Sequence, residues 1–209
     1  MSSRAMSRHA RQFLKPVAVL AATFALSGCL GNMVLQDVTD ATLAAGSTIL
    51  VGKVRLEPPL AKDEQYFAGN VVGEGRLVNS VVLLTSTEEV SRPPEQPRIR
   101  DLQDSINAKF DQTFFLKAAQ QPFNITGGMV SLEISNRADY AYLPGRLQVP
   151  IRNGDKAVYI GTLVFHRDDF FEITRVEIRD EFAAAEREYK KQVRGAPPLR
   201  KALLKKIPR

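Results

Sequence analysis

The pattern of apolar and polar positions changes three times along the chain. Val17–Leu26 carries no charge. From about residue 47, short apolar or alternating runs are separated by Gly, Pro and Asn, which is typical of strands joined by turns. Residues 180–194 then repeat apolar residues at spacings of three and four, as one face of a helix requires. The chain therefore reads as a short apolar leader, a β-rich body and a terminal helix.

Two of the expected strands carry irregularities. Ser47–Leu56 has two apolar phases around Gly52, which suits a β-bulge. Residues 170–179 shift phase between Ile173 and Val176, which again indicates a bulge. Further strands are expected at 79–86, 113–118, 129–134, 147–152 and 156–165, and a short helix is expected at 101–109.

The pair Asn153-Gly154 gives the clearest turn signal. Asn-Gly accepts the positive φ angles of a type I′ turn, the commonest connection of a β-hairpin. We therefore expect 147–152 and 156–165 to pair as a hairpin. Pro150 lacks an N–H, so its strand should lie at an edge or pair on one side there.

The segment from Asp180 to Arg194 predicts a helix. Acidic residues open it and basic residues close it, an order that complements the helix dipole. Gly195 and the prolines after it end it. Its expected apolar face consists of Phe182, Ala185, Tyr189 and Val193. With the strands before it, the sequence predicts a mainly β fold, an antiparallel sandwich or small barrel with one C-terminal α-helix.

Composition agrees with a globular domain, and the charge distribution argues against nucleic acid. The 209 residues are 44% hydrophobic and 25% charged, with a net charge of +6. Residues 1–28 hold four basic residues and no acid, and residues 195–209 hold five and none. The body between them carries 20 basic and 23 acidic residues, so we expect no nucleic-acid partner.

Residues 1–28 have the three parts of a secretory signal. A basic n-region precedes the uncharged run Val17–Leu26, whose ten residues rise about 15 Å as a helix, too short to span a membrane. Small residues then lead to Cys29, the only cysteine of the chain. A single Cys excludes an intramolecular disulfide and a multi-Cys zinc site.

The tetrapeptide Leu26-Ser27-Gly28-Cys29 resembles the lipobox of bacterial lipoproteins at all four positions. In that family the Cys thiol receives diacylglycerol, a signal peptidase cuts before the Cys, and the new amino group is often acylated. The resemblance implies an envelope protein held in a membrane by acyl chains on Cys29. Leu30, in place of Asp, implies the outer membrane if the source is Gram-negative.

The mature domain carries a looser likeness. Residues 111–195, with the strand that contains Tyr159-Ile160-Gly161, resemble small sandwich domains of envelope lipoproteins. This likeness brings no catalytic residue with it.

Few residues of the sequence suit catalytic chemistry. His9 belongs to the signal, and His166 lies in His166-Arg167-Asp168-Asp169, which favours a polar turn over a metal or acid–base cluster. One His without a free thiol cannot make a His₂ or His₃ zinc site. Neither a nucleophile elbow nor a phosphate-binding loop occurs. We assign no catalytic residue, metal or cofactor, and expect a protein that is not an enzyme.

The basic end of the chain suggests a contact surface. In a helix, Leu199–Ile207 would place its apolar residues on one face and its four basic residues around the rest. Such a turn can rest on an anionic membrane or another polyanion. The alternatives are a disordered tail or a short helix docked on the domain. The basic residues are Arg200, Lys201, Lys205 and Lys206.

The sequence therefore predicts four parts and one class of function. The parts are a signal peptide (1–28), a lipidated Cys with its tether (29–46), a β-rich domain (47–195) and a basic amphipathic or disordered tail (196–209). The expected role is binding or structural, with the membrane, a protein partner or a second copy. The alternatives are an envelope hydrolase that uses carboxylates and a carrier of a small hydrophobic ligand, which needs an apolar cavity.

Overall fold

The computed structural model describes residues 38–39, 41–68, 76–86, 105–134 and 137–208. The chain divides into two compact units, Met1–Gly31 and Asn32–Arg209, and all described residues belong to the second. The signal sequence and Cys29 lie outside the described residues.

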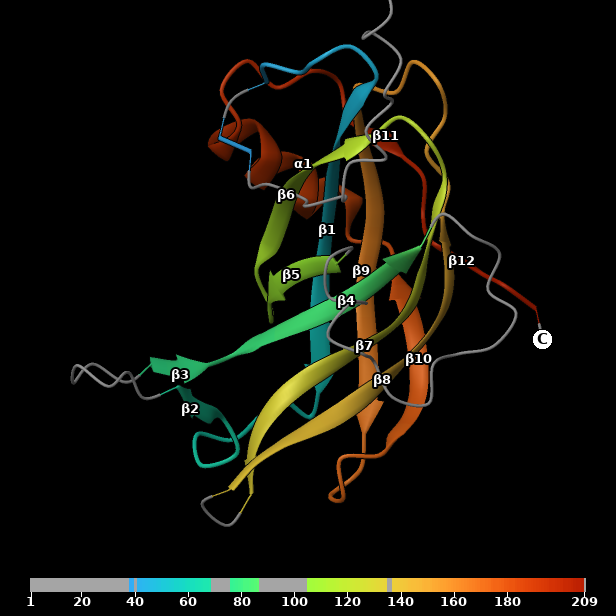
Figure 1. Ribbon diagram of the computed structural model, residues 1–209. Helices are drawn as coiled ribbons and strands as arrows, with labels where there is room; N and C mark the ends of the chain where they lie inside the picture. The colour runs from blue at the N-terminus through green and yellow to red at the C-terminus, as the bar shows by residue number, and fades with distance from the viewer. Residues whose placement is uncertain (1–37, 40, 69–75, 87–104, 135–136, 209) are drawn as a thin grey trace, which may run out of the picture. The chain divides into compact units, whose positions relative to one another are not determined.

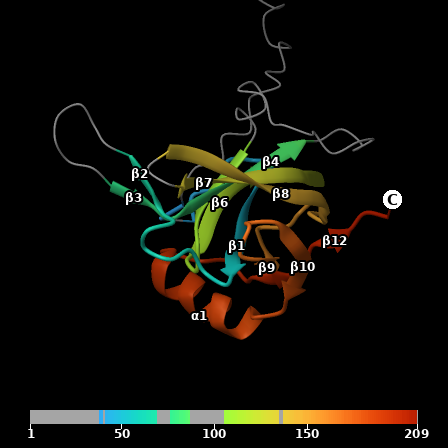
Figure 2. The same ribbon diagram turned by 90° about the horizontal axis from the view of Figure 1, so that it is seen from below.

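Two β-sheets face each other, and a helix covers the outer side of one of them (Figures 1 and 2). The first sheet has the order β10-β9-β1-β6, with β11 also paired to β9, and the second has the order β12-β8-β7-β4-β5. The prediction of a mainly β sandwich with one helix near the C-terminus is confirmed. The strands of the first sheet are β1 (Ser47–Glu57), β6 (Thr113–Ala119), β9 (Ala157–Arg167), β10 (Ile173–Arg179) and β11 (Arg200–Lys201). Those of the second are β4 (Ser80–Ser86), β5 (Ser105–Lys109), β7 (Phe123–Ile134), β8 (Arg137–Val149) and β12 (Lys205–Lys206). A separate ribbon pairs β2 (Tyr66–Ala68) with β3 (Arg76–Val78).

The first sheet is mixed rather than antiparallel, because β1 and β9 run parallel. Both of its faces are covered. Leu50 and Val54 of β1 point into the core between the sheets, whereas Ile49 and Val51 pack with Tyr189 of the helix. A strand that is buried on both faces needs apolar residues in both phases, which explains the composition of β1.

The expected bulge near Gly52 is confirmed, although the extra residue lies in the partner strand. The β1–β9 register shifts between Val51 and Lys53, where two residues of β9, Ile160 and Gly161, face the single residue Gly52 of β1. Gly161 of β9 adopts a φ of +102° there. The second expected bulge is also present, because the β10–β9 register shifts between Ile173 and Arg175.

Two local predictions are wrong. A turn forms at Asn153-Gly154, with the N–H of Asp155 donating to the carbonyl of Arg152 at 3.2 Å. It is not the expected type I′ turn, because Gly154 has a positive φ (+88°) and Asn153 does not. The strands on either side also belong to different sheets, so the turn carries the chain across the sandwich instead of closing a hairpin. The helix expected at 101–109 is also absent where the structure describes it, since 105–109 form β5.

The helix α1 (Phe182–Gln192) buries the predicted face on the first sheet: Ala185, Tyr189 and the following Val193 are buried. Gly195 follows with a φ of +70°. The prediction that it caps the helix is wrong, because the C-terminal cap is Val193, which is extended and lies two residues earlier.

The predicted helix or disordered tail after α1 is wrong. Residues 199–207 are extended and lie against the domain, with Leu199 and Leu204 buried. The N–H groups of Ala202 and Leu204 donate to carbonyls of β9, each at 2.9 Å. Backbone bonds to an open strand edge stabilise this segment better than an isolated nine-residue helix, which is marginal in water.

Candidate functional site

Three of the four basic residues predicted as a contact surface make contacts within the domain. The guanidinium of Arg200 binds both carboxylate oxygens of Asp155, at 2.6 and 2.5 Å, and lowers the pKa of that acid. Lys201 pairs with Asp180 at 2.8 Å, and Lys206 donates to a backbone carbonyl of β10. Lys205 is exposed. At least three of the four therefore fasten the C-terminal segment to the domain.

A hollow of about 510 Å³ opens beside β8, where part of this strand has no partner strand among the described residues. One side of β8 pairs with β7, whereas on the other side β12 pairs only with Leu147 and Gln148. Within the described chain, Asp139–Pro144 has no strand partner on that side. The hollow lies between this edge and residues 170–173, and its walls include Leu132, Leu143, Phe171 and Ile173.

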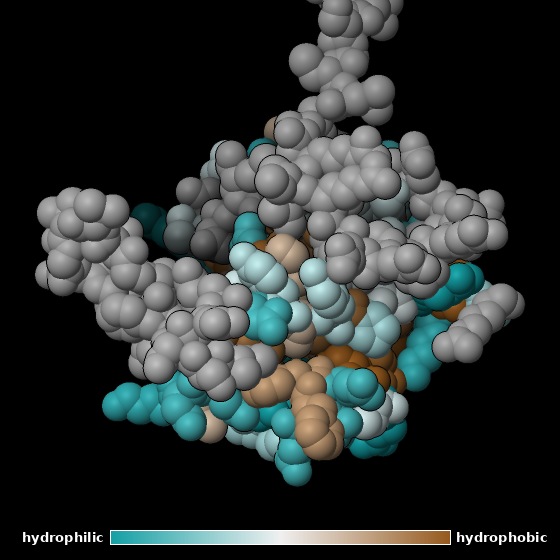
Figure 3. All heavy atoms as spheres, turned by 60° about the horizontal axis from the view of Figure 1, so that its bottom comes forward, coloured by the Kyte–Doolittle hydropathy of each residue, from teal (hydrophilic) through white to brown (hydrophobic). Residues whose placement is uncertain are grey.

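Three aromatic side chains border the hollow and face solvent. Phe170 is 85% exposed, Tyr140 49% and Tyr142 46%, and these are the exposed large hydrophobic residues of the described chain. The lower end of the sandwich in Figure 1, turned forward in Figure 3, shows apolar surface among hydrophilic side chains. Apolar groups that gather at a concave surface indicate an interaction site.

Hydrogen bonds within the loop fix the turn that carries Phe170. The carboxylate of Asp168 accepts the N–H groups of Phe170 and Glu172, each at 2.9 Å. Phe171 has a φ of +63° and turns inward, where the guanidinium of Arg167 lies 4.7 Å from the ring centre. Because these contacts hold the backbone, Phe170 is directed outward by the fold.

Among the described residues that line the hollow, the charged side chains are acidic. Asp139 and Glu172 line it, and Asp169 is exposed in the same loop. The guanidinium of Arg167 does not neutralise these acids, because its side chain is only 6% exposed and pairs with Glu64 at 2.7 Å. The hollow thus combines aromatic rings with carboxylates, a pairing suited to a cation.

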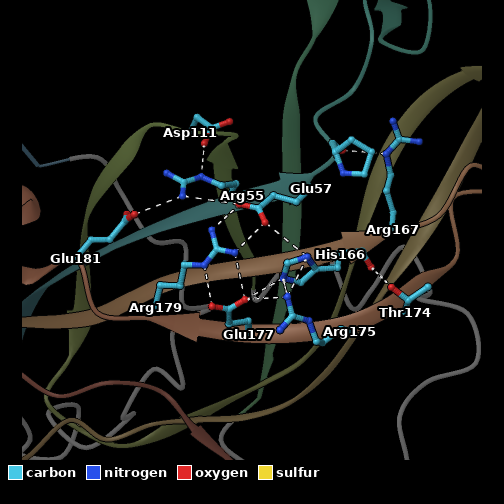
Figure 4. Close-up of polar contacts among 11 residues, drawn as sticks. Arg55, Glu57, Asp111, His166, Arg167, Thr174, Arg175, Glu177, Arg179 and Glu181 are labelled. Carbon is cyan, nitrogen blue, oxygen red and sulfur yellow. Dashed lines mark hydrogen bonds and ion pairs between the residues drawn. The ribbon is translucent and has the colours of Figure 1, made fainter.

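A second polar cluster covers the outer face of the first sheet beside α1 (Figure 4). The sheet register places Glu57, His166 and Arg175 in one row across β1, β9 and β10. Arg179 binds both oxygens of Glu57, at 2.5 and 2.8 Å, and its Nε donates to Glu177 at 2.8 Å. No local pattern in the sequence predicts this cluster. His166 was expected in a turn but lies within β9.

The cluster is arranged to hold charges rather than to move protons. Nε2 of His166 lies 3.0 Å from Glu177 Oε2 and 2.8 Å from Nη2 of Arg175. Arg179 and then His166 lower the pKa of Glu177 to about 2. A general acid or base needs a pKa near the working pH, whereas Glu177 stays ionised. This cluster therefore stabilises the sheet face and gives no support to a carboxylate hydrolase.

The described residues contain no group of three or more His, Cys, Asp or Glu side chains that could hold a metal ion. Within them, no helix has the length and apolar character needed to cross a membrane. Comparison of the chain with models of protein families, with curated proteins and with solved structures gives no match.

Proposed function

We propose that this protein is a lipid-anchored envelope protein that binds a partner in the hollow beside β8 and catalyses no reaction. The observation that carries the binding role is the ring of three exposed aromatic side chains, Tyr140, Tyr142 and Phe170, around a hollow of about 510 Å³. The lipobox resemblance at Cys29 supports the anchor. The carboxylates of the polar cluster are paired with arginines, which supports a role without catalysis.

The arrangement of the strands suits an anchored binder. Residues 41–46 lead into β1 at one end of the sandwich, whereas Phe170 follows β9 at the other end (Figure 1). The 11 residues of β9 between these ends extend roughly 36 Å. A tether attached before β1 would thus leave the hollow at the end of the domain away from the attachment.

A carrier of a small hydrophobic ligand is less well supported. Such a carrier encloses its ligand among apolar side chains. The hollow is open at the edge of β8, and Asp139 and Glu172 contribute to its lining. An acidic, open hollow is better suited to a polar or charged partner.

The test combines anchoring and contact in cells that produce the full chain. A photoreactive phenylalanine analogue replaces Phe170, and the matched control places it at Arg187, which is exposed on α1. We expect crosslinked adducts from position 170 that are absent from position 187. We also expect an acylated protein that begins at Cys29, and a Cys29→Ala variant without acyl mass. Equal adducts at both positions, or no adduct at position 170, would contradict the binding role; an unacylated wild type would contradict the anchor.

A further inference from the structure

The free edge of β8 already accepts a strand at one end. Lys205 and Lys206 of β12 pair antiparallel with Gln148 and Leu147, and the N–H of Ile207 donates to the carbonyl of Arg146 at 2.8 Å. This short strand shows that the edge can be extended by an added backbone.

Beyond β12, the same edge runs into the hollow. Asp139–Pro144 of β8 lies along it, and no other described strand pairs with this side. Pro144 has no N–H, so an added strand would bond mainly to Asp139–Leu143. The N–H of Tyr140 already donates to the Asp139 carboxylate at 2.7 Å. An extended peptide can bond to the other backbone groups on this side and place alternate side chains in the hollow.

Beyond the two lysines of β12, where the edge runs into the hollow, the charged lining side chains are acidic and select the charge of that peptide. Asp139, Asp169 and Glu172 supply carboxylates, and the rings of Tyr140 and Phe170 offer aromatic faces. A Lys or Arg side chain gains from both, through ion pairing and cation–π contact. Anionic head groups or acidic segments would be repelled, so a protein segment fits better than a membrane surface.

From these observations we infer that the hollow binds an extended, basic peptide segment, which adds as a strand to the edge of β8 and sets its cationic side chains against Tyr140, Tyr142 and Phe170. This inference rests on the proposed binding function and names the chemistry of the partner.

The test measures fluorescence anisotropy of labelled peptides with the purified full chain. The probe is an eight-residue peptide of alternating Lys and Val. A second peptide alternates Glu and Val, and a third keeps the lysines but replaces two central valines by proline, which prevents strand pairing. Spermine serves as a competitor that carries charge without a backbone.

We expect saturable binding of the Lys-Val peptide, none of the Glu-Val peptide, and about tenfold weaker binding of the proline peptide. Glu172→Lys should weaken binding about tenfold, because it reverses a charge at the hollow. The matched control, Glu188→Lys on α1, reverses the same charge far from the hollow and should leave binding unchanged.

Several outcomes would overturn the inference. Equal weakening by Glu172→Lys and Glu188→Lys would mean that only the net charge matters. Equal binding of the proline peptide, or full displacement by spermine at the same charge concentration, would mean that a cation binds without strand addition. No binding of the Lys-Val peptide would refute the basic-peptide partner; if position 170 still gave adducts, the proposed binding function would stand, and without adducts both would fail.

Discussion

Removal of the hydroxyl group from either of two buried tyrosines in the same apolar layer should change the free energy of unfolding, in opposite directions. Tyr159 and Tyr189 both lie between the first sheet and α1, with exposures of 1% and 0%. The hydroxyl of Tyr159 accepts the N–H of Glu181 at 2.8 Å. The hydroxyl of Tyr189 has no hydrogen-bond partner among the described residues. Burial without a partner raises the pKa of Tyr189 to about 12.

The expected magnitudes follow from the cost of burying a polar group. A buried hydroxyl without a partner costs about 1–3 kcal/mol. Tyr189→Phe removes this group and keeps the ring that packs 5.9 Å from Phe115, so it should raise the free energy of unfolding by about 1 kcal/mol. Tyr159→Phe leaves the N–H of Glu181 without its acceptor and should lower that free energy by about 1–2 kcal/mol.

Urea unfolding followed by far-UV circular dichroism measures both changes, since the chain has no Trp and the variants remove Tyr fluorescence. A change of 1 kcal/mol moves Tm by about 2–4 °C in a domain of this size. The dependence of the free energy of unfolding on alkaline pH gives an independent check. Unfolded Tyr ionises near pH 10, so the stability of wild type should fall above that pH, and less so in Tyr189→Phe. Destabilisation of both variants by similar amounts would refute the assignment of an unpaired hydroxyl.

Three further predictions concern the contacts that hold the sheets and the C-terminal segment. Arg200→Met should lower the free energy of unfolding by about 1–2 kcal/mol, because Asp155 loses its bidentate partner, and should speed proteolysis of residues 196–209. The pKa of Glu177 is lowered to about 2, so its contribution to stability is complete above about pH 4.5 and is lost as the pH falls toward 2; Glu177→Gln should flatten that acid limb of a stability profile. Gly52→Ala should destabilise by about 1–3 kcal/mol in urea unfolding, since the new Cβ would lie 2.5 Å from an aromatic carbon of β6.

The elements that the sequence predicted correctly are those whose signal is local. The apolar runs of β1 and β4 are bounded by turn residues, and the segment of α1 carries its apolar face within about four turns. Strand partners are a global choice. β1 pairs with β9, about a hundred residues later, and no local pattern announces that pairing. The Asn153-Gly154 turn has the same local chemistry whether it closes a hairpin or crosses between sheets.

The C-terminal segment shows how tertiary context overrides spacing. Leu199, Ala202 and Leu203 have helical spacing. However, the first part of β9, with which β10 does not pair, offers backbone carbonyl groups, and the extended chain donates hydrogen bonds to them. The hollow was missed for a related reason. Tyr140 and Phe170 are thirty residues apart and meet only because β8 and the loop after β9 lie together. One local signal was available. Two adjacent large apolar residues, Phe170 and Phe171, lie in an acidic turn, where apolar side chains indicate burial or a binding role.

An unpaired strand edge beside apolar surface can pair with the same edge of another copy of the chain. The features of β8 that oppose this pairing therefore help to determine which partner it binds. Its edge is short, and it ends at Pro144, which cannot donate. Asp139 and Glu172 lie beside it, and a pair of such edges would bring the acids of both copies into one interface, where they repel. The same acids attract a basic strand. These acids thus limit self-pairing and favour a cationic segment. Charge alone therefore distinguishes the proposed partner from a second copy of this chain.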